Sequence, residues 1–377
     1  MSAPEDLPEP DRIDGVPHPR AAQQLFGHAN AEAAFLEAFN AGRLQHGWMI
    51  TGPRGVGKAT LAWRLARFLL AQPAPQPGSS GALFQPPAAT SLDVAPENPA
   101  VAQLAAGAHP GLLVLRRGYD TKAKRLRAVI TVDEMRRLHG FFGMRATDGG
   151  WRVVIVDAAD EMNPNAANAL LKSLEEPPAR AILLLVAHRP SALLPTIRSR
   201  CRMLSLAPLD GADMASALTQ AGFDPGAQAG ALAALSGGSV GTALRLLAAD
   251  GLALYGELTQ VLGAAPQIDR ARLLALANSA AGRGAEERFD LLLSLTELWL
   301  ARLARAGVTG PPHPEAAPGE AAVLARLAPG VAAAQLWAGA ASGLVARARQ
   351  GRAVNLDPAG LVLDMGLRVE GIARQIA

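Results

Sequence analysis

The sequence contains a single cysteine, Cys201, in a chain of 377 residues. One thiol cannot form an internal disulfide or supply a cysteine-based zinc site, so neither kind of cross-link is expected in this fold. No apolar run reaches the ~18 residues of a transmembrane helix, and we expect no membrane partner. The formal net charge is only +3, which does not by itself indicate a nucleic-acid-binding protein.

The start of the chain lacks the features of a secretion signal. Residues 1–15 are acidic and rich in proline, whereas a signal peptide has basic residues followed by an apolar stretch. We therefore expect the protein in the cytoplasm. Hydrophobic residues make up 50% of the chain, so it can bury a sizeable core, and we expect two or three domains.

The first part of the chain alternates predicted strands and helices. Residues 46–51 predict a buried strand that runs into a glycine-rich turn, and residues 59–70 predict a helix with an apolar face. Residues 72–110 are rich in proline and alanine, which indicates an insertion to which we assign no fold. Further runs typical of central parallel strands occupy 112–115, 153–156 and 182–186.

The second part of the chain predicts helices only. No buried strand is evident beyond about residue 206, and a further change of pattern occurs near residue 266. The sequence therefore predicts an α/β domain over 1–206, a small helical domain over 207–266 and a third, helical domain over 267–377.

A glycine-rich loop joins the first predicted strand to the helix that follows it. Its sequence is GPRGVGK, over residues 52–58. Between a strand and a helix, the backbone N–H groups of such a loop surround phosphates, and its lysine reaches the terminal ones. The alternative, a turn that only connects the two elements, rarely has this spacing. The residues expected to bind nucleotide phosphates are Gly52, Gly55, Gly57 and Lys58.

The positions that would serve magnesium and the attacking water are incomplete. Ala59 follows the lysine and has no hydroxyl for magnesium, while Thr60 is rotated by about 100° around the helix. A strand that ends in Asp157 resembles a Walker B strand, which places an acid beside the phosphate loop. The next residue is Ala158, without a carboxylate to orient water. Thr60 and Asp157 remain candidates for nucleotide binding, although Asp157 could simply cap the next element.

Two later segments point to a family. Residues 163–178, NPNAANALLKSLEEPP, and the triplet Ser199-Arg200-Cys201 resemble the corresponding helix and SRC motif of clamp-loader subunits of the AAA+ family. The resemblance implies that Arg200 projects into the ATP site of the next subunit in a ring. Its planar, permanently charged guanidinium suits the oxygens of a transferring phosphoryl group. Without the preceding helix, Arg200 could equally be an ordinary surface arginine.

The resemblance also implies a fold and partners. It implies an AAA+ P-loop domain, with a parallel sheet flanked by helices, then a helical lid and a helical collar through which subunits associate. Expected partners are the gamma/tau and delta subunits of the DNA polymerase III clamp loader, the sliding clamp and primed DNA. The basic run 116–127 either contacts DNA or forms a solvated hairpin. Many family members hold zinc through four cysteines where this chain has the cysteine-free segment 72–110, so no zinc is expected.

Departures from the family pattern bear on catalysis. Gly241 stands where active subunits have an arginine that contacts the nucleotide, and His188 stands at the best match to a small polar residue. Together with Ala59 and Ala158, Gly241 argues against ATP turnover, because such losses typically cost orders of magnitude in phosphoryl transfer. The retained Arg200 favours a non-motor subunit that supplies an arginine to a neighbour's ATP site. Its own site is expected at most to bind ATP, without hydrolysing it. Whether the chain is itself an enzyme stays open.

Two other functions remain as alternatives. One is a hydrolytic motor subunit of the gamma/tau kind, with Asp157, Asp160 or Glu161 as the acid and Thr60 at the magnesium ion. The other is a P-loop kinase acting on a small molecule, which the SRC motif and the helical C-terminal third disfavour.

Overall fold

The computed structural model describes residues 9, 12–13, 15–73, 88–122, 124–143, 149–282 and 284–376. Most of the acidic N-terminal segment and residues 74–87 of the predicted insertion therefore lie outside the described residues. The chain divides into two compact units. The first contains residues 1–224 and 238–242, and the second contains 225–237 and 243–377. The proposed division into three domains stays a prediction.

The first unit contains a five-stranded sheet in the order β2-β5-β6-β1-β7, in which all strands are parallel. The predicted parallel sheet is thus confirmed. Four of its strands, β1, β2, β5 and β6, coincide with the apolar runs of the sequence because central parallel strands are covered on both faces; β6 is buried at every position. The edge strand β7 was not predicted, because only one of its four residues is buried. The strand bounds are β1 Gly47–Thr51, β2 Leu112–Arg116, β5 Arg152–Asp157, β6 Ala181–Ala187 and β7 Arg202–Ser205.

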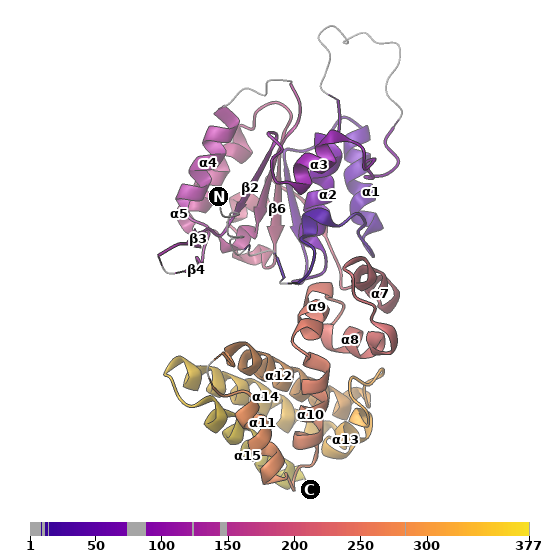
Figure 1. Ribbon diagram of the computed structural model, residues 1–377, viewed down its shortest axis with the longest axis vertical. Coiled ribbons are helices and arrows are strands. Elements are labelled where there is room, and N and C mark those ends of the chain that lie inside the picture. The colour runs from indigo at the N-terminus through magenta and orange to yellow at the C-terminus, as the bar shows by residue number, and fades with distance from the viewer. Residues whose placement is uncertain are drawn as a thin grey trace, which may run out of the picture. The chain divides into compact units, whose positions relative to one another are not determined.

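Helices cover both faces of this sheet. Figure 1 shows α1, α2 and α3 on one side of the strands and α4 and α5 on the other. Shorter elements are the hairpin of β3 (Tyr119–Asp120) and β4 (Arg125–Leu126) and the 3-10 turns η1 (Pro19–Ala21), η2 (Ala159–Glu161) and η3 (Pro190–Ala192). The helix bounds are α1 Ala29–Asn40, α2 Lys58–Leu70, α3 Pro99–Ala105, α4 Val132–Gly143, α5 Pro164–Glu175, α6 Pro195–Arg198 and α7 Gly211–Gln220.

Local sequence signals explain several of these helices. The side chain of Asn163 accepts a hydrogen bond from the Ala166 amide at 2.8 Å, and Pro164 occupies the first turn, as the sequence predicts for α5. Helix α3 was not predicted, because it lies inside the segment interpreted as an insertion. Asn98 caps it, and Leu104 is buried, so part of that segment belongs to the folded unit.

The second unit is helical throughout its described residues. Its elements are η4 Gly226–Gln228, α8 Ala229–Ser236, the larger part of α9 Val240–Ala248, α10 Gly251–Gly263, α11 Arg270–Ser279, α12 Glu286–Thr309, α13 Glu320–Leu327, α14 Val331–Ala353 and α15 Pro358–Ile376. Its core contains the fully buried side chains Tyr255, Phe289, Trp299 and Trp337. Within the described ranges, no single helix has the length and apolar composition needed to cross a membrane. Two pairs of consecutive helices, each bent at a short break, meet these two criteria when the pair is taken together.

Candidate functional site

The glycine-rich loop lies at the carboxyl end of β1, where it turns the chain into α2. Gly52, Gly55 and Gly57 all have positive φ, of 138°, 75° and 104°. Side chains rarely adopt these conformations. At Gly52 there is also no space, because a Cβ would lie 2.3 Å from the carbonyl oxygen of Leu206. The loop geometry therefore explains the glycines that the sequence analysis singled out.

Lys58 begins α2, and its side chain folds back onto the loop. Its Nζ donates hydrogen bonds to the carbonyl oxygens of Gly52, at 2.7 Å, and of Pro53. Burial lowers the pKa of Lys58 to about 8, aided by the charge of Arg54, while the carboxylates of Asp157 and Asp160 act in the opposite direction. A phosphate that entered this loop would have to replace the two carbonyl partners.

A later segment packs directly on the loop. The Ser239 hydroxyl donates to the carbonyl oxygen of Arg54 at 2.8 Å, and the Gly241 amide donates to that of Gly55 at 3.0 Å. A Cβ at Gly241 would lie 2.9 Å from the Gly55 Cα. The position at which the sequence analysis noted a missing arginine therefore holds a glycine in close backbone contact with the phosphate loop.

The three acids considered for hydrolysis have different surroundings. Asp160, with a side chain only 2% exposed, accepts hydrogen bonds from the amides of His188 at 2.8 Å and Arg189 at 3.2 Å. Glu161 forms ion pairs with Arg54 at 2.8 Å and with Arg117. These two carboxylates are engaged in holding the backbone and neighbouring arginines.

Asp157 is the acid whose charge raises the pKa of Lys58 most. It ends β5, is buried, and acts electrostatically on Lys58. Ala158, which follows it, is buried and has no polar side-chain atom. Beyond the lysine, Ala59 and Thr60 lie half-buried in the first turn of α2. The first turn of α2 therefore offers a single hydroxyl, that of Thr60, for a metal ion held with a nucleotide.

His188 follows β6 and lies near the same lysine. Burial, reinforced by the charges of Lys58 and Arg54, lowers its pKa to about 4. The imidazole is therefore neutral at physiological pH. Its Nδ1 is buried and has no hydrogen-bond partner within the described ranges.

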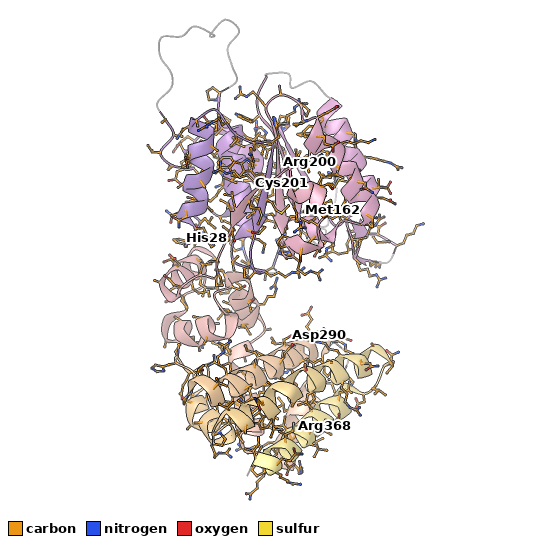
Figure 2. The ribbon with its side chains drawn as sticks, turned by 180° about the vertical axis from the view of Figure 1, so that it is seen from behind. His28, Met162, Arg200, Cys201, Asp290 and Arg368 are labelled. Atoms are coloured by element: carbon orange, nitrogen blue, oxygen red, sulfur yellow. The ribbon has the colours of Figure 1, made fainter. Side chains whose placement is uncertain are left out.

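Arg200 lies at the amino ends of the strands, opposite the carboxyl ends where this loop lies. It comes just before β7, whose Arg202 pairs with Trp48 near the start of β1, whereas the phosphate loop follows Thr51 at the end of β1. At ~3.3 Å per strand residue, the two ends are separated by roughly 15 Å. Figure 2 shows Arg200 beside Cys201 and away from His28, whose Nε2 lies 2.8 Å from the loop carbonyl oxygen of Val56. The arginine therefore faces away from its own phosphate loop.

The guanidinium of Arg200 has two partners on its own chain. Its Nη1 donates to the carbonyl oxygen of Thr196 at 3.0 Å, and its Nη2 lies 2.8 Å from Oε1 of Glu175, the last residue of α5. Sequence reasoning missed this ion pair, since nothing local links the two positions. Burial raises the pKa of the neighbouring Cys201 thiol to about 12, so it is not a reactive thiolate.

In the basic run 116–127, Arg116 ends β2, and the strands of the β3–β4 hairpin follow. Arg117 pairs with Glu161, and the exposed cations of the run are Lys122, Lys124, Arg125 and Arg127. Contact between this hairpin and DNA stays a prediction. In the part of the chain that the structure describes, no group of three or more His, Cys, Asp or Glu side chains is placed to hold a metal ion.

Comparison with known proteins relates this geometry to a family. A family model described as "DNA polymerase III, delta subunit" matches residues 27–210. The chain is 42% identical over 212 residues to the DNA polymerase III subunit delta' of Pseudomonas aeruginosa, in a match that covers 54% of this chain and 57% of that protein. It is 32% identical over 260 residues to the delta' subunit of Yersinia pestis, covering 67% of this chain and 69% of that protein.

A solved structure, a DNA polymerase III gamma subunit-related protein of Thermotoga maritima, aligns with 90% of this chain and 100% of its own at 16% identity and a TM-score of 0.40. Because a TM-score of 0.40 is too low to support an argument about the fold, the fold class rests on the parallel sheet and its flanking helices. The sequence relationship is stronger, because the match at 32% identity covers 69% of the Yersinia pestis protein. The chain belongs to the family of DNA polymerase III delta' subunits.

Proposed function

We propose that this chain is a non-motor subunit of a DNA polymerase III clamp loader, in which Arg200 completes the ATP site of an adjacent subunit. The observation that carries the proposal is the position of Arg200 at the amino ends of the strands, whereas its own phosphate loop lies at their carboxyl ends. An arginine there cannot reach a nucleotide held by Lys58, but it is half-exposed and can reach one held by a neighbour.

The chemistry asked of Arg200 is electrostatic. In the facing site, the oxygen of a water molecule bonds to the γ-phosphorus of ATP while the bond to the β–γ bridging oxygen breaks. ADP leaves with that electron pair, and the water proton passes to the neighbour's site or to solvent. The guanidinium takes no proton; its charge and paired N–H groups stabilise the negative charge on the transferring oxygens.

We propose further that the chain's own phosphate loop retains at most nucleotide binding, without turnover. Gly52, Gly55, Gly57 and Lys58 form the loop, with Thr60 and Asp157 nearby, and Lys58 must exchange its carbonyl partners for a phosphate. Ala59 supplies no magnesium ligand. Gly241 supplies no cation, and the backbone contact with Gly55 leaves no space for a longer side chain without a shift of the segment.

The hydrolytic alternative requires an acid that orients water. Asp160 is bonded to two backbone amides, and Glu161 is paired with two arginines, so each would have to give up these partners first. The third candidate, Asp157, is followed by Ala158, where hydrolytic subunits have the carboxylate that orients water. These features support the non-motor assignment over a motor of the gamma/tau kind. In the proposed complex, gamma/tau and delta subunits are the direct partners, and the sliding clamp and primed DNA are bound through the whole assembly.

The test uses the assembled clamp loader with Arg200→Ala in this chain. Removing an arginine finger typically lowers phosphoryl transfer by about 10³ to 10⁵ at the site it serves, so DNA-stimulated ATPase and clamp loading should both fall while assembly is unaffected. Arg198 is exposed on α6, two positions earlier, and Arg198→Ala is the matched control. Equal ATPase rates in the two variants would contradict the proposal.

A further inference from the structure

The contacts of Arg200 within its own chain raise the question of how it reaches a neighbour. Two of its nitrogens are turned back toward Thr196 and Glu175. The planar fork that would meet phosphoryl oxygens is thus already facing a carboxylate, and carboxylate and phosphate compete for the same donors. Arg200 must leave Glu175 before it can serve an ATP site in trans.

We propose that Glu175 holds Arg200 on its own subunit until the neighbouring ATP site draws the guanidinium away. This inference rests on the proposed trans role of Arg200. It makes Glu175 a positioning residue: the carboxylate touches no nucleotide, and it acts only by setting how often the arginine is free. The more negatively charged triphosphate of a bound nucleotide is the competitor that releases it.

The exposure of the pair indicates a weak and reversible contact. The side chains of Arg200 and Glu175 are 38% and 48% exposed, and ion pairs in such surroundings are strongly screened. A pair of this kind favours the held state by about twofold to fivefold, or roughly 0.4 to 1 kcal/mol at 1.4 kcal/mol per factor of ten. A held-to-free ratio of about 2 to 5 leaves roughly a third to a sixth of the arginines free. Because the free fraction multiplies the apparent efficiency of the finger, removing the hold should raise that efficiency by a similar factor.

The next residue provides a matched control. Glu176 is also exposed and follows Glu175 directly, and the described residues show no ion pair for its side chain. Glu175→Gln removes the charge that holds Arg200, whereas Glu176→Gln removes an equal charge at almost the same place. Any effect of net charge or of altered folding of α5 should appear in both variants.

The experiment has two parts. In the isolated full-length chain, the rate at which an arginine-specific dicarbonyl reagent modifies Arg200, followed by mass spectrometry, should rise about twofold to fivefold in Glu175→Gln and stay unchanged in Glu176→Gln. In the assembled loader without DNA, the basal ATPase rate should rise by a similar factor in Glu175→Gln alone, with the KM for ATP unchanged.

The outcomes separate the two proposals. If Arg200→Ala loses ATPase but Glu175→Gln matches the wild type in either labelling or basal ATPase, the holding role is overturned and the trans role stands. If Arg200→Ala itself retains wild-type ATPase, the trans role fails, and the holding role fails with it. Equal increases in Glu175→Gln and Glu176→Gln would also overturn the holding role, because they would reflect charge alone.

Discussion

A buried carboxylate in the second unit allows a quantitative prediction about the stability of that unit. Glu320, at the start of α13, is 0% exposed. Its Oε1 accepts hydrogen bonds from the Tyr255 hydroxyl at 2.6 Å and Arg302 Nε at 2.7 Å, and its Oε2 accepts from Arg302 Nη2 at 2.9 Å and the Ala316 amide at 2.6 Å. These contacts connect α10, α12 and α13 through one side chain.

The substitution Glu320→Ala should destabilise this unit by about 3 to 5 kcal/mol, the range found when one partner of a buried ion pair is removed. The reason is that the variant leaves the Arg302 charge without its counter-ion and the Tyr255 hydroxyl and Ala316 amide without their acceptor. Tyr255→Phe removes only the donor of one hydrogen bond to a charged group and should cost about 1.5 to 3 kcal/mol.

Urea unfolding of the full-length chain, followed by helical circular dichroism, measures these losses in the transition of the helical unit. Glu297→Gln is the control, because its pair with Arg349 is about half-exposed and should contribute only about 0 to 1 kcal/mol. A loss below about 1 kcal/mol in Glu320→Ala would contradict this prediction, since it would mean that the buried charge of Arg302 is compensated elsewhere.

The ionisation of Glu320 should also make the stability of the second unit depend on pH. Burial alone would raise the pKa of Glu320, but the hydrogen bonds from Arg302 and Tyr255 outweigh it and lower the pKa below its ordinary value of 4.5. The stability it contributes is therefore fully present above pH 4.5 and is lost as the pH falls through the lower, folded-state pKa. The difference in stability between wild type and Glu320→Gln should shrink over that acidic range.

Three further predictions concern the proposed function. The isolated chain should show no ATP turnover above a Lys58→Ala control; magnesium-dependent hydrolysis that this substitution abolishes would assign it to the motor class. Elemental analysis should find no stoichiometric zinc, and a bound zinc ion would require histidine and carboxylate ligands in place of cysteines. If residues 267–377 form the collar, aspartate at Leu336 and Leu367, which are 45% and 50% exposed, should weaken co-assembly without unfolding the chain. Normal assembly of that variant would place the main interface elsewhere.

The parts of the fold that depend on neighbouring residues could be predicted from the sequence. The strand, glycine-rich loop and helix around Lys58 follow from a short pattern, and the start of α5 follows from Asn163 and Pro164. Helix α3 was missed because proline and alanine dominate the segment around it, although Asn98 before Pro99 is an N-terminal helix signal.

The details that decide the chemistry depend on residues far apart in the chain. No pattern links Gly241 to Gly55, Asp160 to the amides after β6, or Glu175 to Arg200, and each of these contacts follows from how the strands and helices pack. The sequence alone identifies the glycine-rich loop and nominates Arg200, whose role stays a prediction, whereas the contacts that hold these side chains required the structure.

The central claim is that this chain serves one ATP site in trans and hydrolyses none itself. The most direct measurement is a rapid-quench count of the ATP molecules hydrolysed per assembled loader in the first turnover after DNA is added. With Arg200→Ala in this chain, we expect a burst smaller by one ATP per complex, with the remaining sites hydrolysing at the wild-type rate. An unchanged burst, or a uniform slowing of every site, would contradict it.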